Sequence, residues 1–389
     1  LAGIALVYEI ALQFYSRRVA TLAALLLALS PFDIQFAPTA FLDPLMVALI
    51  LGSGLLTLRG RYLGAGLAAG LAIMTKPQGP LFLPFTLLLA GASLWQARGR
   101  RKRLPAALGL GVGFGVVAGV GLAWDLWLRP VGVTWAQVGV AHYGGLGVVS
   151  PAEILPRLQG WLALAQYVTG SHVLNALLLA GLPCLLAYDL WRRPARPGWA
   201  YDWVLALYGA YLLAAHTALS FQVWDRYILG LAPIAAILLA RVALLPLDLL
   251  QGAAPALRVG YGTLLAVTLA AALAWPVHTA QRYRYPLGGD HGAHQGIEQV
   301  AAFLRGTAAP HSIIYHSDLG WHYGFYLFGA PFEFYYYPTE QFVLDTAQQF
   351  PQVEKYIAFG DWSSPASLRT ILEQGGWALQ EIYRAYRPD

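Results

Sequence analysis

Ten long apolar runs dominate the chain and limit what it can fold into. They lie at about 1–15, 19–31, 44–58, 62–75, 80–97, 104–128, 172–190, 201–220, 226–246 and 257–277. Only 12% of the 389 residues are charged, whereas soluble domains carry about 25%, so the charged residues cannot cover a soluble surface. Several runs are shorter than the roughly 20 residues that a membrane span needs, and flanking Phe, Pro and Gly residues extend them, or they lie inside the bundle. The sequence therefore predicts a mostly α, polytopic transmembrane helix bundle over residues 1–280, with about ten spans.

The basic residues between these runs indicate which loops lie on which side of the membrane. Alternate loops carry fourteen Lys and Arg residues on one side and four on the other, and the remaining seven of the 25 lie in the C-terminal part. Because loops rich in Lys and Arg stay in the cytoplasm, the first set is predicted to be cytoplasmic. This topology also explains the net charge of +5 without a nucleic-acid partner. The other loops and the C-terminal part are predicted to be extracytoplasmic, on a plasma (inner) membrane.

Residues 281–389 differ from the rest because polar residues become common. Short β-rich runs at 312–316, 355–359 and 377–383 alternate with helical patterns such as 294–305, which predicts a small extracytoplasmic α/β domain. The aromatic run 334–337 is interpreted as a buried or edge strand rather than as a surface for lipid or sugar. The domain has no Gly-rich phosphate loop, and a single cysteine, Cys184, excludes a disulfide framework or a thiolate metal cluster in the chain.

Asp43 is the first candidate for a functional residue, since it carries a charge at the mouth of a predicted membrane helix. The topology puts Lys76, Arg226 and Tyr227 on the same, extracytoplasmic side. The two cations would neutralise a phosphate on a lipid tail, and the carboxylate could accept a proton from an incoming hydroxyl. A metal is not required, because the cations could stabilise a leaving phosphate directly, although a divalent cation remains compatible with the site.

Each candidate also has a purely structural interpretation. Asp43 before Pro44 is typical of a helix start, Lys76 could only extend to the headgroups, and Arg226 could pair with its neighbour Asp225. Weaker candidates for lining the site are His142 and Tyr143, in the long loop 129–171, and Glu9, in the middle of the first apolar run. For Glu9 a hydrogen bond to a neighbouring helix is the favoured interpretation. The spacing of the C-terminal histidines supports no metal site.

Four segments, in this order and spacing, resemble one family of membrane enzymes. They are Leu29-Ser30-Pro31, Phe41-Leu42-Asp43, the run from Gly66 to Pro77 that ends in Met74-Thr75-Lys76-Pro77, and the run from Asp225 to Pro233. Together they are similar to the polytopic glycosyltransferases with the GT-C fold. The likeness is greatest to the family-39, protein-mannosyltransferase-like group, which includes bacterial lipid A aminoarabinose transferases.

The resemblance implies transfer of a sugar from a polyprenyl-phosphate donor to a lipid, glycan or protein acceptor on the extracytoplasmic face. Asp43 would be the second acidic position of the family, and Lys76 and Arg226 match segments that face the donor. The first acidic motif of the family would precede Leu1, so the chain is expected to be incomplete at its N-terminus. The alternative function is a non-catalytic or transporter-like membrane protein that binds a lipid-linked glycan.

Overall fold

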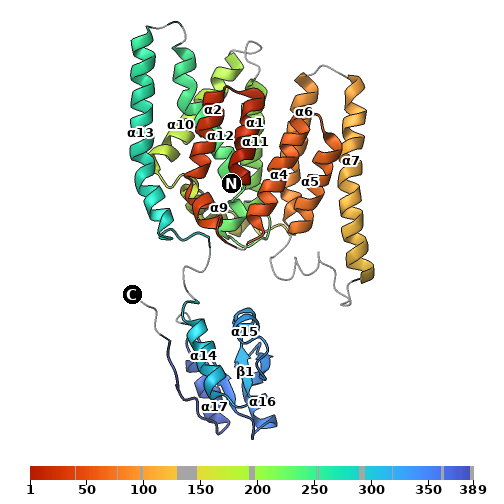
Figure 1. Cartoon of the computed structure of the whole chain (residues 1–389), viewed down its shortest axis with the longest axis vertical. Coiled ribbons are helices and arrows are strands. Elements are labelled where there is room, and N and C mark those ends of the chain that lie inside the picture. The colour runs from red at the N-terminus through yellow and green to blue at the C-terminus, as the bar shows by residue number, and fades with distance from the viewer. Residues whose placement is uncertain are drawn as a thin grey trace. The chain divides into compact units, whose positions relative to one another are not determined.

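The computed structural model of the chain describes residues 1–39, 41–76, 78–96, 100–128, 147–191, 198–250, 252, 254–288, 294–317, 319–360 and 363–385. These residues fall into two compact units, Leu1–Gly289 and Asp290–Asp389. The first unit is helical, and the second combines helices with a small sheet (Figure 1). The fold class expected from the sequence is thereby confirmed.

Each of the ten apolar runs contains a helix. These helices are α1 (Ala2–Phe14), α2 (Arg17–Ala28), α4 (Asp43–Leu58), α5 (Tyr62–Thr75), α6 (Leu83–Gln96), α7 (Arg100–Ala123), α10 (His172–Trp191), α11 (Trp199–Ala218), α12 (Leu231–Leu249) and α13 (Pro255–Gln281). Shorter elements connect them: α3 (Pro31–Phe36), η1 (Gly79–Phe82), η2 (Trp124–Leu128), α9 (Pro151–Ala165), η3 (Gln166–Val168) and η4 (Asp225–Ile228).

Four helices of the described residues are long and apolar enough to cross a membrane by length and composition. They are Leu104–Trp127, His172–Trp191, Leu231–Leu249 and Pro255–Gln281. Of these, α12 is by far the most buried, whereas α7 and α13 have few buried residues and lie at opposite margins of the unit in Figure 1. The chain is therefore an integral membrane protein whose central helix is α12.

Glycines bring α5 and α7 into direct backbone contact. A Cβ atom added to Gly66 would lie 2.2 Å from the carbonyl oxygen of Leu110, and one added to Gly113 would lie 2.2 Å from that of Leu63. The pattern follows the small-xxx-small rule of membrane helices, because Gly66 and Gly70 of α5 lie against α7, and Gly109 and Gly113 of α7 lie against α5. A larger residue at these positions would force the two helices apart.

The two ends of the bundle hold different groups. The Asp43 end is where α4 begins and where α5, α11 and α13 finish, and it includes α3, α9, η3 and η4. The Arg241 end is where α1, α4, α10 and α12 finish. At the Asp43 end, side chains of α3 hold the segment after α13, since the Gln35 amide donates hydrogen bonds to the carbonyl oxygens of Tyr285 (3.1 Å) and Leu287 (2.8 Å).

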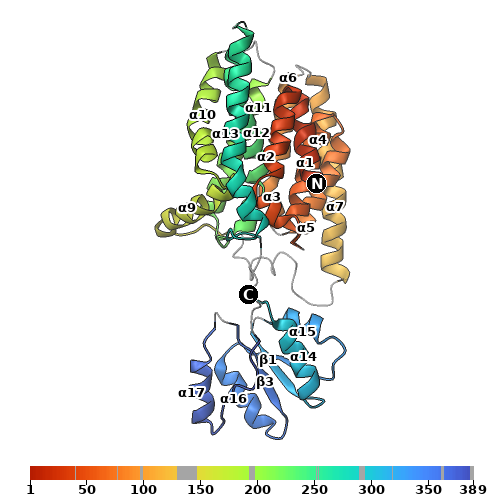
Figure 2. The ribbon, with the colours of Figure 1, turned by 60° about the vertical axis from the view of Figure 1, so that its left-hand side comes forward.

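The second unit is a three-stranded parallel sheet in the order β2-β1-β3. Its strands are β1 (Ile313–His316), β2 (Glu333–Tyr336) and β3 (Lys355–Ile357), with Ile313 in register with Glu333 and Lys355. Helices α14 (Ile297–Thr307) and α15 (Gly320–Tyr326) cover one face of the sheet. Helices α16 (Glu340–Gln349) and α17 (Ala366–Gln374) cover the other face (Figure 2).

The strand expected at 377–383 does not form. Instead, Trp377 lies over the Lys355 ammonium, with 4.9 Å between the nitrogen and the ring centroid, and Tyr383 stacks on Phe303 of α14 at 4.4 Å between ring centroids. These two contacts lie on opposite sides of the sheet, and a straight strand along the edge of β3 could not make both. The aromatic run 334–337 does supply a strand, β2, at the edge of the sheet.

Candidate functional site

A buried ion pair between Asp43 and Lys76 forms the centre of the candidate site. The Lys76 Nζ lies 2.6 Å from Asp43 Oδ1 and 2.7 Å from Asp43 Oδ2, and the two side chains are only 11% and 1% exposed. Burial lowers the pKa of Lys76 below its ordinary value, and the neighbouring Asp43 carboxylate opposes that shift. The pair therefore places a charged donor inside the protein, where its interactions are poorly screened.

The local sequence explains why both side chains reach this place. Helix α4 begins at Asp43 with Pro44 next, and the N-cap position belongs to Leu42, so the Asp43 carboxylate is not used as a cap. Helix α5 ends at Thr75, and a turn follows in which the Gly79 amide donates to the Lys76 carbonyl oxygen at 2.9 Å. Only glycine fits there, because a Cβ atom at position 79 would lie 2.4 Å from the Ile73 Cα.

The second cation, Arg226, lies at the same end of the bundle, where its guanidinium contacts three aromatic rings. Its guanidinium carbon lies 4.2 Å from the ring centroid of Trp224, 5.1 Å from that of Phe41 and 5.5 Å from that of Tyr227. The Tyr227 ring also receives the Lys76 ammonium, at 4.8 Å from its centroid. One phenol ring thus contacts both cations, and the side chains of Lys76 and Arg226 share one aromatic wall.

Several buried polar atoms around this pair make no well-aligned hydrogen bond among the described residues, although the Tyr227 hydroxyl interacts with the side chains of Arg226 and Gln78. They include Gln78 Oε1, Arg226 Nε and Tyr227 OH, and His216 Nε2 lies behind the Tyr227 ring, with 6.4 Å between ring centroids. A buried polar group without a good hydrogen bond costs about 1–3 kcal/mol of stability. Several such groups in one place therefore need an explanation. A polar ligand bound against Lys76 and Arg226 would supply one.

Hydrogen bonds from neighbouring segments hold the chain just before and at η4, the element that carries Arg226 and Tyr227. The Arg157 guanidinium of α9 donates to the carbonyl oxygens of His216 (3.0 Å) and Thr217 (3.1 Å), and Trp161 Nε1 donates to that of His216 at 2.8 Å. Asp225 accepts hydrogen bonds from its neighbour's amide, Arg226 N, at 2.7 Å and from Gly288 N at 2.8 Å. The Asp225 carboxylate therefore binds two backbone amides and forms no hydrogen bond with the Arg226 guanidinium among the described contacts. The Arg226 side chain packs against the aromatic rings instead.

The structure brings together four of the seven residues predicted from the sequence: Asp43, Lys76, Arg226 and Tyr227. It places Glu9 elsewhere, because the Glu9 carboxylate forms an ion pair with Arg59, which directly follows the last residue of α4. That position lies a full helix, about 24 Å, from Asp43, so Glu9 does not line the site and instead links two helices as the favoured interpretation proposed. His142 and Tyr143 lie outside the described residues.

Sequence reasoning missed Gln78, Trp224 and Phe41, which complete the walls around the pair. All three lie within three residues of a predicted site residue, and two are aromatic, which is the signal that could have found them. Among the described residues there is no group of three or more His, Cys, Asp or Glu side chains that could hold a metal ion.

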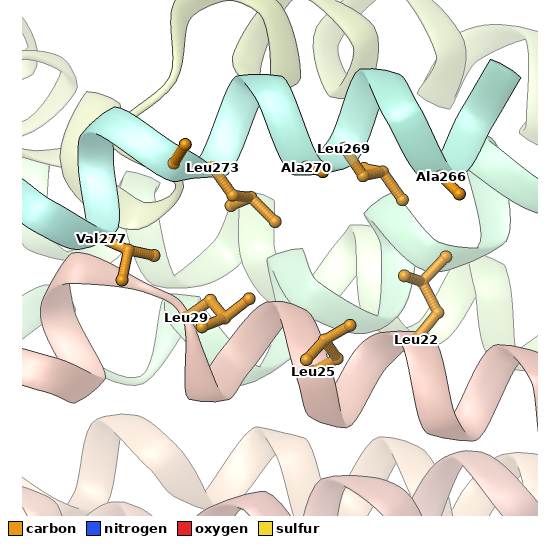
Figure 3. Close-up of a pocket in the computed structure, with 9 residues that line it drawn as sticks. Leu22, Leu25, Leu29, Ala266, Leu269, Ala270, Leu273 and Val277 are labelled. Carbon is orange, nitrogen blue, oxygen red and sulfur yellow. The ribbon is translucent and has the colours of Figure 1, made fainter.

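A large apolar groove of the bundle lies apart from these charges. It has a volume of about 510 Å³ and is lined by Leu22, Leu25 and Leu29 of α2 and by small and aliphatic residues of α13. In Figure 3 the labelled side chains of the two helices face each other across it, and none carries a polar atom. The groove can accept a hydrocarbon chain but offers nothing to bind a phosphate.

Comparisons with known proteins identify the fold of the chain. Residues 1–124 match the model of the dolichyl-phosphate-mannose-protein mannosyltransferase family. A crystal structure of ArnT from Cupriavidus metallidurans bound to undecaprenyl phosphate superposes with a TM-score of 0.53 at 17% sequence identity, covering 91% of this chain and 73% of ArnT. The chain has the GT-C fold. No curated protein sequence matches it. Within the GT-C fold, the segment matched by the family model carries Asp43 and Lys76, and Arg226 lies beyond it.

Proposed function

We propose that this GT-C protein is a membrane glycosyltransferase that uses a polyprenyl-phosphate-linked sugar as its donor. The observation that carries the proposal is the buried Asp43–Lys76 pair beside Arg226 and beside polar atoms that make no well-aligned hydrogen bond among the described residues. The family match and the undecaprenyl phosphate bound by ArnT support a lipid phosphate as the ligand. The loop charges support an extracytoplasmic site, with the acceptor a lipid, a glycan or a protein.

Lys76 and Arg226 are the proposed ligands of the donor phosphate. An ammonium group has three N–H donors, and Asp43 engages the Lys76 nitrogen through two oxygens, so one donor remains for a phosphate oxygen. Arg226 offers a guanidinium whose Nε makes no well-aligned hydrogen bond among the described residues. Two fixed cations would bind the phosphate and stabilise the negative charge that grows on it as the sugar–oxygen bond breaks.

The proposed reaction inverts the anomeric carbon. The acceptor oxygen forms a bond to that carbon, the bond from the carbon to the phosphate oxygen breaks, and polyprenyl phosphate leaves with the electron pair. The acceptor hydroxyl loses its proton to a carboxylate. Asp43 is the proposed contributor to this step: once a phosphate draws Lys76 toward itself, one carboxylate oxygen becomes available as an acceptor.

Transfer assays on the reconstituted full-length protein test the proposal. Purified protein in vesicles is given a labelled polyprenyl-phosphate sugar, and labelled acceptor and released polyprenyl phosphate are both measured. Release of polyprenyl phosphate in proportion to glycosylated product would support the enzyme. Binding or movement of the donor across the bilayer, with no product from any acceptor class, would favour the non-catalytic or transporter-like alternative.

A further inference from the structure

Helix α15 of the second unit exposes a row of aromatic side chains. Trp321, Phe325 and Phe328 are 92%, 75% and 84% exposed. Their spacing of i, i+4 and i+7 puts them on one side of the helix and of the turn that continues it. Such large apolar side chains in a row mark an interaction surface rather than ordinary surface scatter.

The opposite side of the same helix is also apolar. Leu319, Tyr323 and Leu327 are buried in the core between α15, α14 and the sheet. Helix α15 is thus hydrophobic on both sides, which is typical of helices that are covered on both sides. The second unit covers only one of them.

The aromatic row is held in a fixed place. Arg305 of α14 donates to the carbonyl oxygens of Tyr326 at 2.9 Å and of Phe328 at 3.1 Å, which ties the end of α15 to its neighbour. The guanidinium itself is exposed, so it adds a positive charge beside the rings. Trp and Phe side chains next to a cation suit the boundary between lipid headgroups and acyl chains, where interfacial helices bury such rings and keep Lys or Arg at the headgroups.

The short segment between the two units limits how far the aromatic row can lie from the membrane. Helix α13 is one of the four helices able to cross the bilayer, and the segment after it is packed against the Asp43 end up to Gly288. Only eight residues, 289–296, separate Gly288 from the first residue of α14, which limits the distance to about 30 Å. A tether this short gives the unit a high effective concentration at the bilayer surface.

We propose that Trp321, Phe325 and Phe328 form a membrane anchor that inserts at the boundary between headgroups and acyl chains of the bilayer spanned by the first unit. The occupant of this surface is lipid rather than a glycan, because two of the three rings are phenylalanines, which offer no hydrogen bond to a sugar hydroxyl. The inference is independent of the proposed transferase activity.

A spin label at position 324 tests the anchor without removing any of its rings. Gly324 is exposed next to Phe325 and one helical turn before Phe328, and a Cβ atom there would meet no other atom within 4 Å. Cys184, the one native cysteine, is replaced by serine, and the label is attached to Gly324→Cys in the full chain. The matched control is Glu373→Cys, an exposed position on α17, across the sheet.

Collision rates with oxygen, which concentrates in lipid, and with a water-soluble nickel chelate are measured in phosphatidylethanolamine–phosphatidylglycerol vesicles. We expect the oxygen-to-nickel ratio at 324 to be several times that at 373, and to fall to the control value when Trp321, Phe325 and Phe328 are replaced by serine. Equal ratios at 324 and 373 would overturn the proposal. A label at 324 shielded from both reagents would overturn it as well, because that result indicates burial against protein.

Discussion

Among the described residues, the bundle contains two buried carboxylate–cation pairs, one toward each end, and they are built differently. At the Arg241 end, Asp202 accepts hydrogen bonds from Arg241 Nε at 3.0 Å and Nη2 at 2.8 Å, and Tyr15 donates to the same carboxylate. The Tyr15 ring also lies 4.7 Å from the guanidinium carbon. The contact between Arg241 and Asp202 is planar and bidentate, and Arg241 Nη1 also lies 3.7 Å from Asp248 Oδ2.

The pair at the Asp43 end uses an ammonium in place of a guanidinium and lies beside polar atoms that make no well-aligned hydrogen bond among the described residues. A lysine ammonium is a compact charge whose donors can be redirected, whereas the bidentate Arg241–Asp202 contact has one geometry. Two buried pairs thus have different uses: the one held by a bidentate contact and a tyrosine hydrogen bond stabilises the helix packing, and the one that lies beside Arg226 is arranged for a ligand. The predictions below test this difference.

The largest expected effect is on stability, from Arg241→Met. The substitution leaves the Asp202 charge buried and unpaired, which costs about 3–5 kcal/mol, so the melting temperature should fall sharply. The matched double variant Asp202→Leu/Arg241→Met removes both charges and should regain most of the loss. Thermal unfolding in detergent checks both. A single variant that melts like the wild type would show that the Arg241 pair does not hold the helices together.

Asp43→Asn should act on turnover, and because it leaves the buried Lys76 ammonium without its carboxylate it should also lower the melting temperature. Removing the proposed acceptor of the proton is expected to lower the rate of sugar transfer by about 10²-fold or more, in protein that still binds the donor. Glu9→Gln is the control, since it neutralises a carboxylate at the other end of α4 and should leave transfer near the wild-type rate. Normal transfer by folded Asp43→Asn would remove Asp43 from the reaction.

Arg226→Gln should weaken binding of the lipid phosphate. The loss of one charge-assisted contact is worth about 1.5–3 kcal/mol, or at least about a tenfold rise in Kd for polyprenyl phosphate. Stability should change little, because the guanidinium rests on aromatic faces. Arg59→Gln, at the far end of α4, serves as the control and should bind as the wild type does. Unchanged binding in Arg226→Gln would place the phosphate elsewhere.

The smallest effect compares two tyrosines. Tyr15→Phe removes a hydrogen bond to Asp202 and should cost about 1 kcal/mol of stability. Tyr227→Phe removes a hydroxyl that interacts with Arg226 and Gln78 but makes no well-aligned hydrogen bond among the described residues, so it should lower the melting temperature less than Tyr15→Phe does and act mainly on donor binding. If Tyr227→Phe proved the more destabilising of the two, the contrast between the two ends would be wrong.

The sequence predicted the helices and most of the candidate site for a simple physical reason. Long apolar runs have no other stable arrangement in a bilayer, and counting basic residues in the loops was enough to expect Asp43, Lys76 and Arg226 on one side. The contact between Asp43 and Lys76 was not predicted, because neither loop charges nor periodicity give the rotation of one helix against another.

The pair at the Arg241 end was missed altogether. Arg241 was assigned to a cytoplasmic loop, and no role was predicted for Asp202. Both lie inside apolar runs, Asp202 in the first turn of α11 and Arg241 in the middle of α12, and opposite charges inside apolar runs are a signal that could have been used. Two other features depend on tertiary packing and cannot be predicted from the local sequence pattern. One is the register of α1 against α4, which pairs Glu9 with Arg59. The other is the set of aromatic contacts made by residues 377–383 in place of a strand.

The hydrogen bond from Gly288 to Asp225 has a mechanical consequence. Gly288 has a φ of +80°, and a Cβ atom there would lie 2.8 Å from the Gln35 carbonyl oxygen, so this contact leaves room for no other residue. The chain leaves the first unit at that point, and Asp225 is covalently joined to Arg226. A force on the segment that leads to the second unit therefore reaches the backbone of Arg226 through the Asp225 carboxylate, while the Gln35 side chain holds the same segment against α3.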